Sequence, residues 1–168
     1  MTGTVIDEKV AGLRRNVRAF IDVITALPKE RFLAKLDDAW TPRDVTAHLI
    51  GWNRASIRGI GDLRQGRMPY LHDDPGEDFA KANAFLVEEY ASRDRDELVR
   101  QLEASSEELA AFMLTLDPAD WDRDWGVTLE GEPRTLRNSF GPLVEDYVSH
   151  QRRIETWAGG GTRPGSRS

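Results

Sequence analysis

The sequence of 168 residues contains no cysteine. This absence excludes disulfide bonds, a thiolate nucleophile and any metal site built on cysteine. Long apolar runs are absent as well, since no stretch approaches the roughly 18 apolar residues of a membrane span. The first residues do not form a basic segment followed by an apolar one. We therefore expect a cytoplasmic protein that has no membrane partner.

Basic residues are fewer than acidic ones. Lysine and arginine number 23 against 29 aspartates and glutamates, which gives a formal net charge of -6 at pH 7. Such a chain has no general attraction for nucleic acid or for an anionic membrane. We expect a small-molecule substrate and no nucleic-acid partner. The length fits one domain with a substantial core.

Apolar residues recur at three- and four-residue steps through most of the chain, which is the period of an amphipathic helix. The pattern predicts a first helix over 5–27, a second over 41–65, one long or kinked third helix over 78–116 and a fourth over 135–157. Thr41 and Pro42 mark the start of the second helix, because threonine is a favoured N-cap residue and proline suits the first helical position. Pro142 should bend the fourth helix or lie in its first turns.

Two long connections, 66–76 and 118–134, are expected to border the mouth of a pocket. The second contains Val127-Thr-Leu, which could form a short strand. Three glycines starting at Gly159 should stop the last helix, and residues 159–168 are predicted to be a disordered tail. The fold prediction is therefore an all-α four-helix bundle over residues 1–158, with its pocket between helices.

His48 and His150 lie on the predicted second and fourth helices, and Asp146 precedes His150 by four residues. Residues at this spacing share a helix face, so Asp146 and His150 can bind one ion together. A helical projection places Asp146 about 60° from the apolar stripe and points Glu145 outward. With His48 as a third ligand, the set suits zinc, nickel or iron(II) and leaves positions for water or substrate.

Simpler interpretations exist for each of these residues. A histidine at an apolar seam is often a buried polar side chain satisfied by a neighbour, and an Asp-x-x-x-His pair can be a hydrogen bond within one helix. His72, the third histidine, fits a solvated loop. Trp121 and Trp125 either cover the site as a lid or anchor their own loop, and anchoring is the simpler interpretation.

Four further residues are candidates for substrate binding: Trp52, Asn83, Tyr147 and Arg153. Asn83 and Tyr147 could line a pocket between helices, although packing or a surface position would also explain them. Arg153, like its neighbour Arg152, could bind an anionic substrate, for which the ordinary alternative is a surface ion pair.

The segment Trp40-Thr-Pro-Arg-Asp-Val-Thr-Ala-His48-Leu-Ile-Gly-Trp52 resembles the second-helix signature of the DinB-like superfamily. Asp146-Tyr-Val-Ser-His150 resembles its last-helix motif, and the order and length of the helices agree over residues 5–158. The resemblance implies a four-helix bundle, often a dimer, that in many members holds a divalent ion on three such ligands. Some members are thiol-dependent isomerases or transferases, as in the mycothiol-dependent maleylpyruvate isomerases.

For this chain the resemblance implies a homodimer with a divalent metal at His48, Asp146 and His150, and a low-molecular-weight thiol as a further cofactor. Asp146 departs from the usual pattern, where glutamate or histidine is more common. A second branch, the ClbS/DfsB-like proteins, shares the Leu-Ile-Gly-Trp run that ends at Trp52 and can lack the metal ligands. The alternatives are therefore a metal-free small-molecule hydrolase or a non-catalytic binding or self-protection module. The presence of both histidines favours a metal-dependent hydrolase, transferase or isomerase.

Overall fold

The computed structural model describes residues 3–36, 40–69, 79–91 and 93–160. Its helices are α1 (Val5–Ala26), α2 (Lys29–Phe32), α3 (Pro42–Leu63), α5 (Phe79–Tyr90), α6 (Arg95–Leu114) and α7 (Leu136–Gly160). Between α6 and α7 lie a short 3-10 turn, η1 (Pro118–Asp120), and the strands β1 (Thr128–Leu129) and β2 (Glu132–Pro133). None of the helices in these ranges combines the length and the apolar character that crossing a membrane requires.

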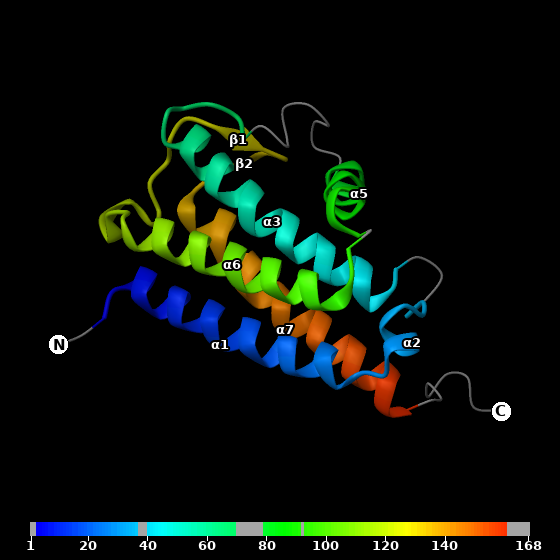
Figure 1. Ribbon diagram of the computed structural model, residues 1–168. Helices are drawn as coiled ribbons and strands as arrows, with labels where there is room; N and C mark the ends of the chain where they lie inside the picture. Colours follow the sequence, from blue (N-terminus) through cyan, green and yellow to red (C-terminus); the bar gives the residue numbers. More distant parts are fainter. Residues whose placement is uncertain (1–2, 37–39, 70–78, 92, 161–168) are drawn as a thin grey trace.

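Four long helices, α1, α3, α6 and α7, pack side by side, which confirms the predicted all-α bundle (Figure 1). All four contribute fully buried apolar side chains to one core, including Phe20, Leu49, Leu109 and Phe140. Burying a side chain of this size contributes about 1.5–3 kcal/mol relative to leaving it exposed. α3 and α7 run in opposite directions, so the first half of α3 lies beside the second half of α7.

Local capping fixes the start of α3, the helix that carries His48. The Thr41 hydroxyl accepts a hydrogen bond from the Asp44 backbone N–H, and the Asp44 carboxylate accepts one from the Thr41 N–H, both at 3.0 Å. Pro42 occupies the first helical position, where its missing N–H costs nothing. The predicted start is confirmed, and it places His48 in the second turn of the helix.

The predicted single third helix is wrong, because the structure has two helices, α5 and α6, in its place. Asp94 caps the new helix by accepting a hydrogen bond from the Glu97 N–H at 2.8 Å. α5 crosses α3 and is seen nearly end-on where α6 is seen from the side (Figure 1). Periodicity did not reveal the break because both helices turn apolar residues towards the bundle.

Smaller differences concern the ends of the helices. The polar connection expected after the first helix contains the short helix α2. α7 continues through Gly159 and Gly160, so these glycines do not stop the helix where the sequence predicted. Residues 161–168, to which most of the expected disordered tail belongs, lie outside the described residues.

Pro142 lies in the second turn of α7 without interrupting it. Proline has no N–H, so the carbonyl of Asn138, four residues earlier, loses its helical donor. Arg134 supplies a replacement, since its Nη2 donates to the Asn138 carbonyl at 3.3 Å. A side chain from outside the helix thus compensates for the proline.

The connection between α6 and α7 is held against the bundle. Trp121 is 3% exposed and belongs to the core, which supports anchoring over a lid. The predicted strand is confirmed as β1, which pairs with β2 through a tight turn at Glu130 and Gly131. Both turn residues have positive φ, 55° and 81°, as a two-residue hairpin with the favoured twist requires. This hairpin delivers Arg134 to the start of α7.

Candidate metal centre

His48 occupies the interface between α3 and α7 and is 6% exposed. The Trp40 ring lies against it, with ring centroids 5.1 Å apart. Its Nε2 lies 3.2 Å from Oδ2 of Asp146 on α7, and this distance is that of a hydrogen bond. Packing from one side and a carboxylate on the other therefore fix the plane of the imidazole.

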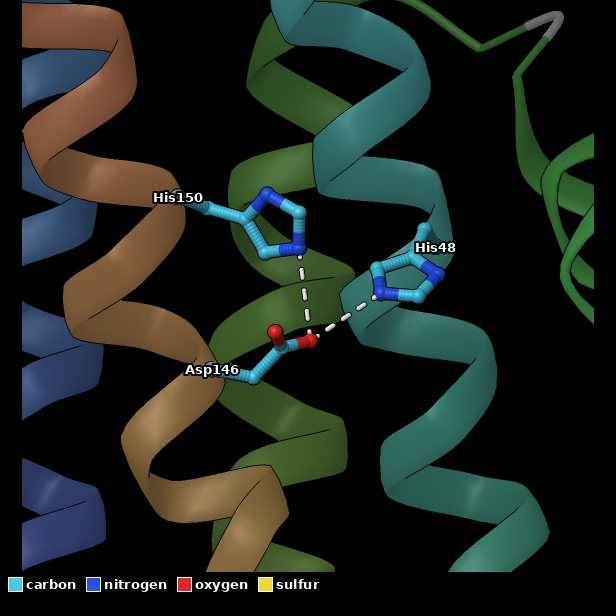
Figure 2. Close-up of side chains that lie close together, drawn as sticks. All are labelled: His48, Asp146 and His150. Carbon is cyan, nitrogen blue, oxygen red and sulfur yellow. Dashed lines mark hydrogen bonds and ion pairs between the residues drawn. The ribbon is translucent and has the colours of Figure 1, made fainter.

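His150 reaches the same carboxylate from within α7. Its Nε2 lies 3.3 Å from Oδ2 of Asp146, one helical turn earlier. Figure 2 shows both imidazoles directed at this one oxygen, and their ring centroids are 5.2 Å apart. The predicted convergence of His48, Asp146 and His150 is present, with one ligand atom from each within 4.8 Å of the others. Glu145 is exposed, as the helical projection predicted.

Two of the three separations among these donor atoms match those expected around a divalent metal ion. Ligands about 2.1 Å from a tetrahedral ion lie about 3.4 Å from one another. The two nitrogen–oxygen separations in the cluster, 3.2 and 3.3 Å, are close to that value. Two imidazoles and one carboxylate make a set of three protein ligands, which leaves a coordination position for a water molecule or a substrate.

The protonation states of the cluster favour cation binding. Burial alone would raise the pKa of Asp146, but hydrogen bonds from His150 and His48 hold that pKa well below its ordinary value. The carboxylate is therefore an anion at neutral pH. Burial is the largest influence on His48 and lowers its pKa, so its neutral form is favoured. Metal binding requires an ionised carboxylate and neutral imidazoles, and the lowered pKa values of Asp146 and His48 favour these states.

The tautomer of His48 follows from its surroundings. Its Nε2 faces an ionised carboxylate, so a neutral ring carries its proton on Nε2. Its Nδ1 is buried and makes no hydrogen bond to the part of the chain that the structure describes. Binding an ion through Nε2 would move the proton to Nδ1, because a nitrogen that binds a metal cannot also carry a proton.

A pocket of about 550 Å³ adjoins the three residues. Trp52 and Asn83, two of the predicted substrate-binding residues, line it, and the Trp52 indole N–H donates to Oδ1 of Asn83 at 2.6 Å. Pro69 and Arg134 line it from the two long connections, which confirms that both connections border the pocket. Residues 70–78, including His72, lie outside the described residues.

The two other predicted substrate-binding residues are not at the pocket. Tyr147 is fully buried, and its hydroxyl donates to Oδ1 of Asn53 at 2.8 Å. Asn53 in turn donates to the Ser105 hydroxyl at 3.0 Å, which links α7, α3 and α6. Arg153 is exposed and outside the lining. Tyr147 does face the inside of the bundle, as a pocket position requires, but core and pocket both lie inside, so the helical pattern could not separate them.

Several residues near the centre were not predicted. Trp40 belongs to the quoted segment, although its contact with the His48 ring depends on the turn before α3. A polar residue inside an apolar stripe was the available signal for Asn53, and none was available for Ser105. Arg134 reaches the pocket because the β1–β2 hairpin turns the chain back, and the sequence did not indicate where this hairpin would lie against the bundle.

Comparison with known proteins assigns the chain to a family. The family model of the mycothiol maleylpyruvate isomerase N-terminal domain matches residues 13–155. The chain belongs to this family. The matched range contains all three residues of the cluster, and the family has the DinB-like fold, whose members are often metal-binding and thiol-related. The resemblance found in the second-helix and last-helix segments is thereby confirmed at the level of family and fold.

Two further comparisons concern relatives. No functionally curated protein matches the chain. A crystal structure of a protein from Streptococcus pneumoniae has a similar fold, with a TM-score of 0.75 and 13% sequence identity. The alignment covers 94% of this chain and 91% of that chain. At this identity the likeness concerns the fold alone.

Proposed function

We propose that this member of the mycothiol maleylpyruvate isomerase N-terminal domain family is an enzyme that acts on a small molecule and depends on a divalent metal. The observation that carries the proposal is the meeting of His48, Asp146 and His150, with ligand atoms within 4.8 Å, at the wall of a pocket of about 550 Å³. Zinc, nickel and iron(II) all suit two imidazoles and a carboxylate. An ion in this position would lower the pKa of a bound water or thiol towards neutrality.

The charge and the burial of the cluster residues favour the binding of a cation. Asp146 supplies a negative charge at neutral pH, because its hydrogen bonds to both histidines keep its pKa low. His48 is held by the Trp40 ring and is almost fully shielded from water, which strengthens electrostatic interactions at that point. Trp52 and Asn83, joined by a hydrogen bond, form a fixed part of the wall that a substrate would meet.

Thiol transfer, isomerisation and hydrolysis all follow from the chemistry of such a centre. A low-molecular-weight thiol as a second substrate is part of the proposal because the family is often thiol-related. A homodimer and a cytoplasmic location remain predictions from the sequence.

A second candidate is a metal-free function, either hydrolysis of the ClbS/DfsB-like kind or binding and self-protection without catalysis. The supporting observation is that Nε2 of each histidine already lies within 3.3 Å of Oδ2 of Asp146 in the structure. A His–Asp pair of this kind can orient an imidazole as a general base without any ion.

Metal content decides between the two. The protein is purified without chelator, loaded with zinc, nickel and iron(II) in turn, desalted and analysed by mass spectrometry of the metals. We expect about one ion per chain, and His48→Ala and His150→Ala should abolish it. Glu145→Ala is the matched control, since Glu145 adjoins Asp146 but is exposed, and it should retain the ion. If the wild-type protein retains none of the three metals, the metal-dependent proposal is wrong and a metal-free function replaces it.

A further inference from the structure

The pocket is long as well as large. Along α3 its lining extends from His48 to Ile60, and along α7 from Asn138 to His150. Each of these stretches rises through 12 residue steps, which corresponds to roughly 18 Å of helix. α3 and α7 are antiparallel (Figure 1), so the two lining stretches run along the same groove from opposite sides. The His48–Asp146–His150 cluster lies at one end, and the start of α7, with Arg134, lies at the other.

Arg134 is a half-buried cation at this second end. Its Nη2 donates to the Asn138 carbonyl at 3.3 Å and to the Ser139 hydroxyl at 3.4 Å, both neutral oxygens. Its Nε is buried and has no hydrogen-bond partner within the described ranges. Burial lowers the pKa of Arg134, and the exposed Glu130 only partly offsets this. A charge removed from water and bonded only to neutral groups gains when an anion joins it.

The surface between the two ends is largely apolar. Ala55, Ile60 and Leu143 are buried or nearly so and line the groove together with Pro69. Ser56 and Ser139 add hydroxyl groups to the lining beyond the cluster. An apolar channel with a polar group at each end suits a ligand with an apolar body and two polar ends.

We propose that the pocket binds an elongated small molecule whose anionic end, a carboxylate or a phosphate-type group, lies at Arg134 while its reacting group lies at the His48–Asp146–His150 cluster, roughly 12 Å away along α7. Arg134 is in this view a residue that determines specificity. The position of the reacting group rests on the proposed function, whereas the anion site at Arg134 does not. A planar guanidinium can bind either anion through two parallel hydrogen bonds, which gives orientation as well as charge.

The purely structural alternative is that Arg134 serves only to satisfy the carbonyl freed by Pro142. Arg134→Gln separates the two roles, because glutamine keeps an N–H donor for that carbonyl and loses the charge. Arg152→Gln is the matched control, since Arg152 is an exposed arginine on α7 that does not line the pocket. Thermal unfolding is recorded for both variants, and Arg134→Lys, which keeps the charge without the planar fork, replaces Arg134→Gln if that variant does not fold.

The probes are thiols with different tails, titrated calorimetrically into zinc-loaded protein. Mercaptoundecanoic acid is long enough to bring its carboxylate near Arg134, mercaptoundecanol has the same length without charge, and mercaptopropionic acid is too short. We expect the long acid to bind about tenfold more tightly than the alcohol in wild type and in Arg152→Gln, a charge-assisted contribution of the usual size. Arg134→Gln should reduce this preference to about twofold or less and leave the short acid unaffected, while Arg134→Lys should retain part of it. Mercaptoundecylphosphonic acid, compared with the carboxylic acid, identifies which anion is preferred.

A second titration keeps this inference separate from the metal proposal. Decanoate and decanol are titrated into chelator-treated wild-type and Arg134→Gln protein. If zinc does not bind at all, the proposed function fails, and the decanoate preference alone decides whether Arg134 recognises anions. Equal affinity for acids and alcohols in the wild-type protein, or a preference that survives in Arg134→Gln, would overturn the inference.

Discussion

Asp146 and His48 are 98 positions apart in the sequence, yet Oδ2 of the one lies 3.2 Å from Nε2 of the other. This relationship depends on the register of α3 against α7, because the next position along either helix points about 100° away from the interface. Close by in the same interface, Tyr147 donates to Asn53 from the fully buried side of α7. We therefore expect the cluster to depend on a buried hydrogen bond that does not itself touch the pocket.

Tyr147→Phe tests that dependence. The change leaves Oδ1 of Asn53 buried without its donor, which should lower the free energy of unfolding by about 1–3 kcal/mol. Urea denaturation measures the change, and zinc affinity should weaken in parallel because the register is held less firmly. Tyr90→Phe is the control, since the Tyr90 hydroxyl accepts from Arg54, which also pairs with Glu108. An equal loss of stability in both variants would contradict a special role for Tyr147.

The contact between α3 and α5 depends on Gly51. A Cβ atom added there would lie 2.7 Å from Cβ of Leu86, and that atom, close to the α5 backbone, has little freedom to move. Gly51→Ala should therefore cost about 1–3 kcal/mol of stability through overpacking. Gly61, ten residues further along α3, has nothing within 4 Å of such an atom, so Gly61→Ala should stabilise by about 0.4–1 kcal/mol. Thermal unfolding of the pair checks both signs.

The metal-free protein should lose stability in mild acid. The pKa of His48 is lower in the folded protein than its ordinary value, chiefly because of burial. As the pH falls below about 6.5, an unfolded histidine binds a proton that folded His48 does not, so the unfolded state is favoured. The Asp146 pKa is also lowered, and its contribution is lost at still lower pH, below about 3.9. Chemical denaturation between pH 8 and pH 5 measures the first effect.

His48→Gln serves as the control for the pH dependence, because glutamine does not titrate. Its stability curve between pH 8 and pH 5 should be flatter than that of the wild-type protein. A curve of unchanged slope would show that the acid sensitivity comes from groups other than His48.

Asp146 allows the charge and the length of the ligand to be tested separately. Asp146→Asn keeps an oxygen in place but loses the negative charge, and zinc affinity should fall by more than about tenfold. Asp146→Glu keeps the charge on a longer side chain of the kind more usual in this motif, and stoichiometric binding should persist. Competition with a chromogenic chelator measures both affinities. A neutral variant that binds as tightly as wild type would show that Asp146 is not a ligand.

The sequence predicted the bundle because local signals agreed with the periodicity, as at Thr41 and Pro42. It predicted the Asp146–His150 pair because one helical turn is a local relation. The meeting with His48 depended on topology, which the resemblance to a known fold supplied. The break between α5 and α6 was missed, although Asp94 is a residue that favours a cap.

The position of Arg134 could not be predicted in this way. Its contact with the Asn138 carbonyl depends on a hairpin turn at Glu130 and Gly131 and on Pro142, which lies eight residues after Arg134. The turn and the proline can each be recognised in the sequence, but only the folded chain shows that they meet at Arg134. For Tyr147 the position inside the bundle was predicted, but its hydrogen-bond partner Asn53 was not.

Pro142 has a consequence beyond the shape of α7. If an alanine stood in its place, its N–H would pair with the Asn138 carbonyl, and the guanidinium of Arg134 would lose one of its two hydrogen bonds to the first turn of the helix. Pro142, which carries no charge and donates no hydrogen bond, thus helps to hold the cation of Arg134 in place. The ligand preference of this pocket would then depend on a backbone N–H that Pro142 lacks. Substituting Pro142 by another uncharged residue would alter which molecules the pocket accepts without changing any polar side chain within it.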